Sequence, residues 1–132
     1  MRLRTELGGD PTQVSRARRL VSSELAGWRI DADAADITVL LVSELVTNAL
    51  LHGSPPIRLG ISPTATGLRV EVYDGDADRL PAVQQIRLDL PGGRGMRLVE
   101  ALSARWGAAV TADGKCVWCE LDCEHSSDDR RP

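Results

Sequence analysis

Apolar residues recur at two different periods along this chain, and these periods predict its elements. Leu3, Thr5 and Leu7 alternate at period two, which predicts a short strand before Gly8-Gly9. Asp10-Pro11 then supplies a helix N-cap followed by proline in the first turn, so we predict a helix from about 11 to 26. Gly27 ends this helix, whose apolar residues at helical spacing are Val14, Ala17, Leu20, Val21 and Leu25.

The longest helical pattern begins at a cap supplied by Asp31 or Asp33 and runs to about His52. Gly53 ends it, and Pro55-Pro56 prevent its continuation. Alternating apolar residues then predict two strands, IRLGIS and LRVEVYD, which are joined by a hairpin turn at PTATG.

The segment after Asp74, GDADRLPAVQQIRLDLPGG, shows no clear period and contains two prolines and three glycines. A loop this long in a compact domain usually serves as a lid or a binding loop. The helical period returns from Arg94 to a stop at Gly107, with Met96, Val99, Ala101 and Leu102 available for the core. AAVTA and CVWCEL then predict two strands joined by a tight turn at DGK.

This order of elements predicts an α/β (α+β) two-layer sandwich, in which about three helices cover one face of a mixed, mostly antiparallel sheet. A length of 132 residues, 42% of them hydrophobic, suits one domain over residues 1-123. Aromatic residues are only 3% and Phe is absent, so the core must consist largely of Leu, Val, Ile and Ala. Residues 124-132 form a polar tail that we expect to be disordered.

Charge and hydropathy narrow the classes of partner. The net charge is −3 and the basic residues are scattered, which argues against direct binding of nucleic acid. The group Arg16, Arg18 and Arg19 is either a solvated helix face or a surface for a protein partner. We identify no apolar run of the roughly 18 to 20 residues needed to span a bilayer and no signal sequence, so we expect a cytoplasmic protein without membrane contact.

Three cysteines in CVWCELDC, with His125 close behind, raise the question of a zinc site. A strand here would send Cys116 and Cys119 to opposite faces, and a second pair of ligands is missing. Reduced structural thiols are the preferred interpretation.

Glu44, Asn48 and His52 are spaced four residues apart within SELVTNALLHG, so a helix places all three side chains along one ridge. They are either ordinary residues of a solvated helix face or ligands aimed at a common site. Asp74 at a strand end is either a turn-initiating residue or a recognition carboxylate that needs a donor.

A glycine cluster at Gly92, Gly93 and Gly95 precedes the third helix. Glycines let backbone amides approach an anion that a helix N-terminus already attracts, so we expect phosphates there. The cluster matches neither a dinucleotide fingerprint, because Leu98 stands where the third glycine belongs, nor a P-loop.

Four segments together, ELVTNALLHG, VYDGDADRLP, GGRGMRLVEAL and GKCVWCEL, resemble the N box, the two glycine boxes and the last strands of the GHKL (histidine-kinase/Hsp90-like) ATPase superfamily. The chain is similar, over about residues 3 to 122, to the anti-sigma-factor serine/threonine kinases of actinobacterial type. The resemblance implies a Bergerat-type ATP-binding fold, with ATP and Mg²⁺ as cofactors.

The resemblance also assigns roles to residues. It implies Glu44 as the general base, Asn48 as the magnesium ligand and Asp74 as the acceptor for adenine's exocyclic amine. Arg94 either reaches the terminal phosphate or projects into solvent, and His52 either caps its helix or packs near the ligand. The implied cofactor-binding set is Asn48, His52, Asp74, Gly92, Gly93, Arg94, Gly95 and Met96.

Two residues depart from the superfamily pattern. Asp76 stands where the first glycine box usually has a glycine, and Cys116 stands where many relatives carry a threonine near the start of the last strand. Cys116 is a poorer hydrogen-bond partner for adenine or a bridging water, so both departures predict weaker nucleotide affinity.

The implied function is that of a protein kinase that binds a sigma factor and phosphorylates an anti-sigma-factor antagonist, with a homodimer suggested through the first helix. The alternative is an ATP-binding regulatory module that captures a partner protein without phosphoryl transfer. A two-component histidine kinase is disfavoured because we find no helical hairpin with a phospho-accepting histidine before the domain. The chaperone, topoisomerase and mismatch-repair ATPases are disfavoured because 132 residues leave no room for their transducer domains.

Overall fold

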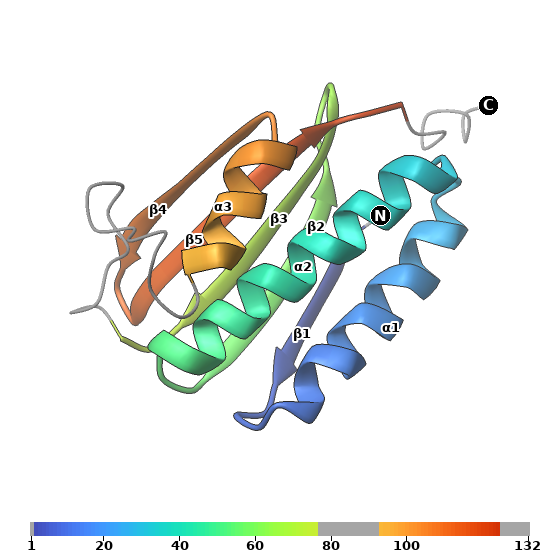
Figure 1. The fold of residues 1–132 in the computed structure, drawn as a ribbon. Helices are drawn as coiled ribbons and strands as arrows, with labels where there is room; N and C mark the ends of the chain where they lie inside the picture. The colour runs from blue at the N-terminus through green and yellow to red at the C-terminus, as the bar shows by residue number, and fades with distance from the viewer. Residues whose placement is uncertain (1, 77–92, 125–132) are drawn as a thin grey trace.

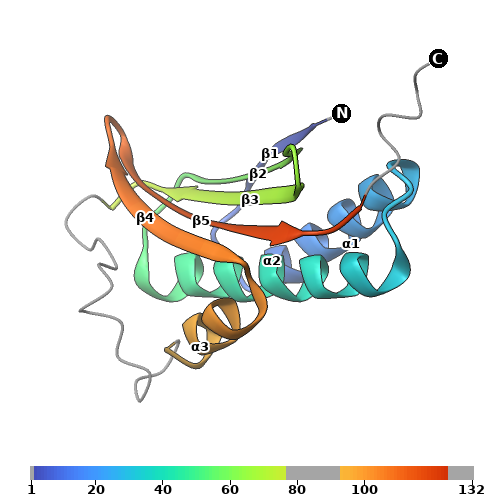
Figure 2. The ribbon, with the colours of Figure 1, turned by 90° about the horizontal axis from the view of Figure 1, so that it is seen from above.

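A computed structural model of the chain describes residues 2–76 and 93–124. Within these residues, three helices cover one face of a five-stranded sheet and leave the other face open (Figures 1 and 2). The strand order is β1-β2-β3-β5-β4 and all four pairings are antiparallel, which confirms the predicted fold class and order of elements. The elements are β1 (Leu3–Leu7), α1 (Thr12–Gly27), α2 (Ala32–His52), β2 (Ile57–Pro63), β3 (Gly67–Asp74), α3 (Gly93–Leu102), β4 (Arg105–Thr111) and β5 (Gly114–Asp122).

Aspartate side chains lie at the start of the first two helices. The N-cap position of α1 is Pro11 and not the predicted Asp10, whose carboxylate accepts a hydrogen bond from the amide of Thr12, the first residue of α1, at 2.9 Å. Of the two candidate caps of α2, the structure uses Asp31, whose carboxylate accepts from the Ala34 amide at 2.9 Å. Gly53, with an extended backbone, ends α2 as predicted.

The core lies between the sheet and α2, which runs across the middle of the helix layer between α1 and α3 (Figure 1). Four apolar side chains of α2 are almost fully buried, and each contributes about 1.5–3 kcal/mol; they are Leu41, Val42, Leu45 and Val46. Thr38, also fully buried, donates its hydroxyl to the Ala34 carbonyl at 2.7 Å, so the helix itself satisfies its polar atom.

The third helix ends at Leu102 and is therefore shorter than predicted from the sequence, which placed its end near Trp106. The Ala104 amide donates to the Glu120 carbonyl at 2.7 Å, so the chain has already turned to pair with β5. Arg105, Trp106 and Gly107 therefore belong to β4. Ala101 is exposed and not part of the core, whereas Met96 and Val99 are buried as predicted.

The last hairpin also differs from the prediction. Its turn is formed by Ala112 and Asp113, and β5 begins at Gly114. The sequence pattern predicts Lys115 in the turn, but it is a residue of β5 that pairs with Asp74 of β3. Residues 77–92 of the predicted loop and residues 125–132 of the predicted tail lie outside the described residues.

The expectation about membrane-length segments needs one correction. α2 is long and apolar enough to cross a membrane by length and composition alone, with a mean hydropathy of 1.6 in its most apolar window. This is weak evidence, because the core helix of a soluble protein passes the same test. α2 packs on the sheet between the other two helices, and 39% of its most apolar window is buried.

Candidate functional site

Asp74, the last residue of β3, is buried where the sheet meets the C-terminal end of α2. Its side chain is only 2% exposed. A Cβ atom added to Gly53 would lie 2.5 Å from both Cγ and Oδ2 of Asp74, so the carboxylate packs directly against the residue that ends α2. The Gly75 amide donates to the Ser54 carbonyl at 2.7 Å and ties the two segments together. The structure thus brings the strand-terminal carboxylate to the predicted helix.

Lys115 neutralises this buried carboxylate. It lies opposite Asp74 in the β3–β5 pairing, and its side chain is 4% exposed. Its Nζ lies 3.0 Å from Oδ1 and 2.9 Å from Oδ2 of Asp74, and it also donates to the Asp76 carbonyl at 3.2 Å. All three N–H donors of the ammonium group therefore have acceptors nearby.

Sequence reasoning missed Lys115, although the chain carried a signal for it. Val117, Cys119 and Leu121 alternate along the last strand, and period-two alternation extended backwards places Lys115 on the same, helix-facing side. An inward-facing lysine at a strand end needs a buried anion.

Glu44 and Asn48 lie one helical turn apart on α2. A hollow of ≈ 410 Å³ lies between α1 and α2, with Arg18 and Ser22 of α1 on one side. Glu44 lies at the rim of this hollow, whose other α2 residues are Asp36, Val39, Leu40 and Ser43. Glu44 and Asn48 are both half-buried, so neither side chain lies in open solvent. Asn48 precedes Gly53 by five residues, which is about 7.5 Å along the helix axis.

His52, the third residue of the ridge, is exposed at the last position of α2.

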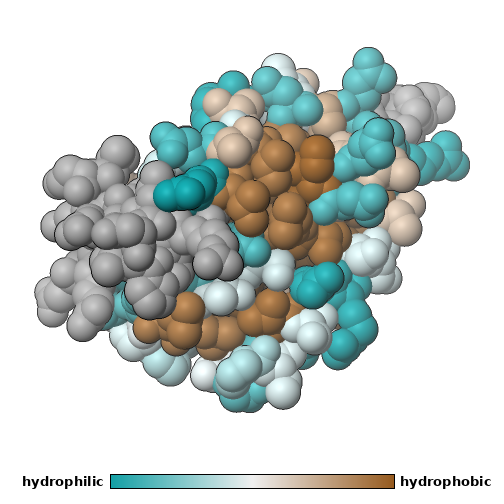
Figure 3. Space-filling view, viewed as in Figure 1, coloured by the Kyte–Doolittle hydropathy of each residue, from teal (hydrophilic) through white to brown (hydrophobic). Residues whose placement is uncertain are grey.

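α3 lies on the side of α2 that is turned away from α1, and it begins beside the C-terminal half of α2 (Figures 1 and 2). Hydrophobic residues gather on this face over α2 and beside α3 (Figure 3). Met96 is 3% exposed and belongs to the core cluster together with Val99. Gly93, Arg94 and Gly95 form the first turn of α3, whereas Gly92 lies outside the described residues.

Cys116 is not beside the buried carboxylate, so the prediction that it stands in for an adenine-binding threonine is wrong. It pairs with Tyr73, and alternation turns both side chains to the open face of the sheet. Burial raises the pKa of the Cys116 thiol to about 11. Asp76 acts here through its backbone, since its amide donates to Asp74 Oδ1 at 2.8 Å.

The three cysteines are free thiols, and their arrangement follows the strand. Cys119 is on the helix-facing side and completely buried, opposite in direction to Cys116, as predicted from the strand alternation. Among the described residues, no group of three or more His, Cys, Asp or Glu side chains could hold a metal ion.

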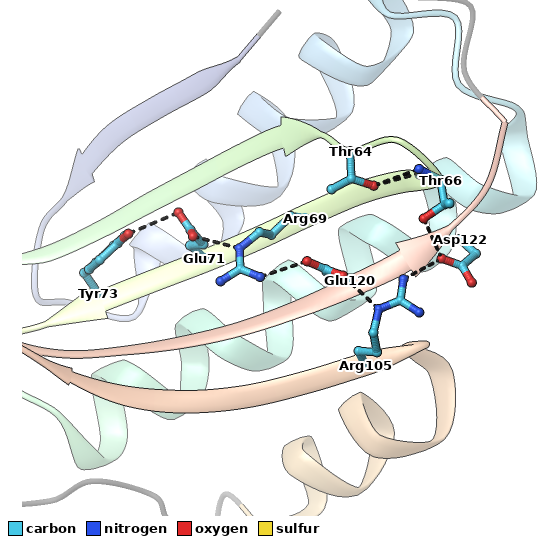
Figure 4. Close-up of polar contacts among 9 residues, drawn as sticks. Thr64, Thr66, Arg69, Glu71, Tyr73, Arg105, Glu120 and Asp122 are labelled. Carbon is cyan, nitrogen blue, oxygen red and sulfur yellow. Dashed lines mark hydrogen bonds and ion pairs between the residues drawn. The ribbon is translucent and has the colours of Figure 1, made fainter.

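A ladder of ion pairs crosses the open face of the sheet (Figure 4). Arg69 binds Glu71 and Glu120 at 2.8 Å each and stacks over Trp118 at 4.2 Å. Arg105 continues the ladder from Glu120 at 2.8 Å to Asp122 at 2.7 Å. These pairs connect β3, β5 and β4 on the face opposite to Asp74.

Comparisons with known proteins identify the family and the fold. A sequence model described as "Histidine kinase-like ATPase domain" matches residues 7–120. The fold is similar to the crystal structure of the RsbU and RsbW domains of Rv1364c from Mycobacterium tuberculosis, with a TM-score of 0.70 and 19% sequence identity. The match covers 94% of this chain and 33% of that one, so this chain spans about a third of the length of that structure. A search of curated proteins finds no match.

Proposed function

We propose that this chain, which belongs to the histidine kinase-like ATPase domain family, binds ATP between α2, α3 and the end of β3. It transfers the terminal phosphoryl group of ATP to a protein. The observation that carries the proposal is the packing of Gly53 against the buried Asp74 carboxylate. This packing puts the proposed base-recognising carboxylate at the end of α2, the helix that carries Glu44 and Asn48.

Three features of the site would each bind a different part of the nucleotide and its metal ion. Asp74 offers a carboxylate acceptor to the exocyclic amine of adenine. The glycine-rich start of α3 offers backbone amides and a positive helix end to phosphates. Asn48 is half-buried and lies five residues before Gly53 on α2.

The residues present fit a magnesium ion bound together with the nucleotide. Mg²⁺ prefers oxygen ligands and usually takes few of them from the protein, with phosphate oxygens and water completing the set. The Asn48 carbonyl oxygen is a ligand of this kind. A bound Mg²⁺ supplies positive charge that neutralises the phosphates.

Glu44 is the proposed general base. It lies one helical turn before Asn48 on the same ridge, so it accepts the proton of an attacking hydroxyl next to the phosphate site. Positioning and electrostatics dominate phosphoryl transfer, so the half-buried placement of this carboxylate matters more than its basicity.

We propose an anti-sigma-factor-type role, in which the protein binds a sigma factor and phosphorylates an anti-sigma-factor antagonist on serine or threonine in the cytoplasm. The similarity in fold to a structure that contains an RsbW domain supports this choice. A homodimer and a partner surface on α1 are part of the proposal.

The test compares the wild type with Glu44→Gln, a near-isosteric change that removes the base. Calorimetry with ATP, with and without Mg²⁺, should show nucleotide binding to both proteins. Transfer of labelled phosphate to the cognate antagonist should fall by about 10²–10⁴-fold in Glu44→Gln. Glu100→Gln, at an exposed position of α3, is the matched control and should retain full activity. The lack of any ATP binding by the wild type would refute the proposal.

The second candidate is an ATP-binding module that captures a partner without phosphoryl transfer. The Lys115 ammonium group at the Asp74 carboxylate favours it, because a nucleotide must compete with an internal donor. This candidate predicts partner binding that depends on ATP and is equal in wild type and Glu44→Gln, with no phosphorylated antagonist from either protein.

A further inference from the structure

We propose that Lys115 is an intramolecular cap on the base-recognition carboxylate, so that adenine binds only after the lysine ammonium group leaves Asp74. The inference rests on the proposed function, since it presumes that Asp74 recognises adenine. It adds a residue that determines nucleotide affinity.

The contacts leave little of Asp74 available to a ligand. Oδ1 accepts from Lys115 Nζ at 3.0 Å and from the Asp76 amide at 2.8 Å, and Oδ2 lies 2.9 Å from the same Nζ. Gly53 packs against Cγ and Oδ2 of the same carboxylate. A second amine can approach as donor only if the ammonium group moves, because Asp74 and Lys115 have just 2% and 4% of their side chains exposed.

The backbone around the pair cannot move aside easily. A Cβ on Gly114 would lie 2.0 Å from the Asp74 carbonyl oxygen, and a Cβ on Gly75 would lie 2.7 Å from the Pro55 carbonyl oxygen. The two strand ends and the segment after α2 are therefore in close contact. The lysine side chain has four rotatable bonds, so it is the component that can leave.

Removing the cap has two opposite effects. Among the described residues, it leaves the Asp76 amide as the donor to the buried Asp74 carboxylate, and the loss of the paired charge destabilises the free protein. It also removes the competing donor, and the affinity for a ligand that supplies an amine rises, because the competent state becomes more populated.

The decisive variant is Lys115→Met, which keeps the length of the side chain and removes the charge and the donors. Calorimetry should show that its Kd for ATP is at least tenfold lower than that of the wild type. Lys115→Arg is the matched control: it retains a cation and its donors, and it should not gain tenfold in affinity.

Inosine triphosphate separates base recognition from a general change in the fold. It has the phosphates and ribose of ATP but carries an oxo group in place of the exocyclic amine. Lys115→Met should gain affinity for ATP and show no comparable gain for inosine triphosphate. An equal gain for both nucleotides would overturn the proposal, because phosphate attraction or loosened packing would then account for it.

Lys115→Gln serves if Lys115→Met does not fold, since its amide still donates one hydrogen bond to Asp74 without the charge. It should bind ATP at least threefold more tightly than the wild type, with no gain for inosine triphosphate. If wild type and folded variants bind ATP with equal Kd, the cap is refuted and the proposed function stands. If neither wild type nor variants bind ATP at millimolar concentration, the proposed function itself fails.

Discussion

Alanine at Gly53 places a methyl group where the Asp74 carboxylate packs. The added Cβ would lie 2.5 Å from Cγ and Oδ2 of Asp74 and 2.8 Å from the Ala49 carbonyl oxygen. Strain in the backbone is not the reason, since Gly53 has a φ of −106° that any residue can adopt. The expected defect is steric and electrostatic at one buried position.

The contacts of the Asp74 carboxylate indicate how much stability Gly53→Ala should lose. The carboxylate cannot rotate freely away from the methyl group, because Lys115 and the Asp76 amide hold it. Overpacking of this kind typically costs about 1–3 kcal/mol. For a domain of this length, that corresponds to a fall in Tm of about 4–12 °C.

Urea denaturation followed by circular dichroism measures the change in the free energy of unfolding. Gly27→Ala is the matched control, because nothing lies within 4 Å of a Cβ at Gly27 in the last turn of α1. It should be neutral or stabilise by up to about 1 kcal/mol. If Gly53→Ala is as stable as Gly27→Ala, the carboxylate does not pack against the end of α2, and the proposed site is wrong.

Three further predictions test the core, the open face and the thiols. Val99→Ala, at a fully buried position of α3, should lower the free energy of unfolding by about 1–3 kcal/mol in urea titrations. Val110→Ala, at a 56% exposed position, is the control and should change this free energy by less than about 0.5 kcal/mol. Hydrogen bonds from Arg105 and Arg69 lower the pKa of Glu120 from its ordinary 4.5. The ionised Glu120 therefore stabilises the fold fully above that pH, and this contribution is lost as the pH falls through the folded-state pKa. The stability difference between wild type and Glu120→Gln should shrink from neutral pH to acid pH, and a constant difference would contradict the ion-pair ladder. Burial raises the pKa of Cys119 to about 12, so a thiol reagent at mildly alkaline pH should modify this residue only after denaturation, as peptide mass mapping can show.

The elements and most of their ends could be predicted from local sequence patterns. Period-two and helical patterns are local properties, so they predicted five strands and three helices in the correct order. Gly53 marked the end of α2 because glycine and the following prolines prevent its continuation. The ridge of Glu44 and Asn48 followed from helical geometry alone.

Which residues meet in space depends on contacts between segments that are far apart in the sequence. The end of α3 depends on a hydrogen bond from the Ala104 amide to the Glu120 carbonyl, which a strand far along the chain supplies, so helical propensity alone placed that end too late. The Asp74 and Lys115 partnership depends on strand register, which places residues 41 positions apart side by side. A local pattern records which way a side chain faces but not which partner it finds there, because that partner is chosen by the pairing of distant strands.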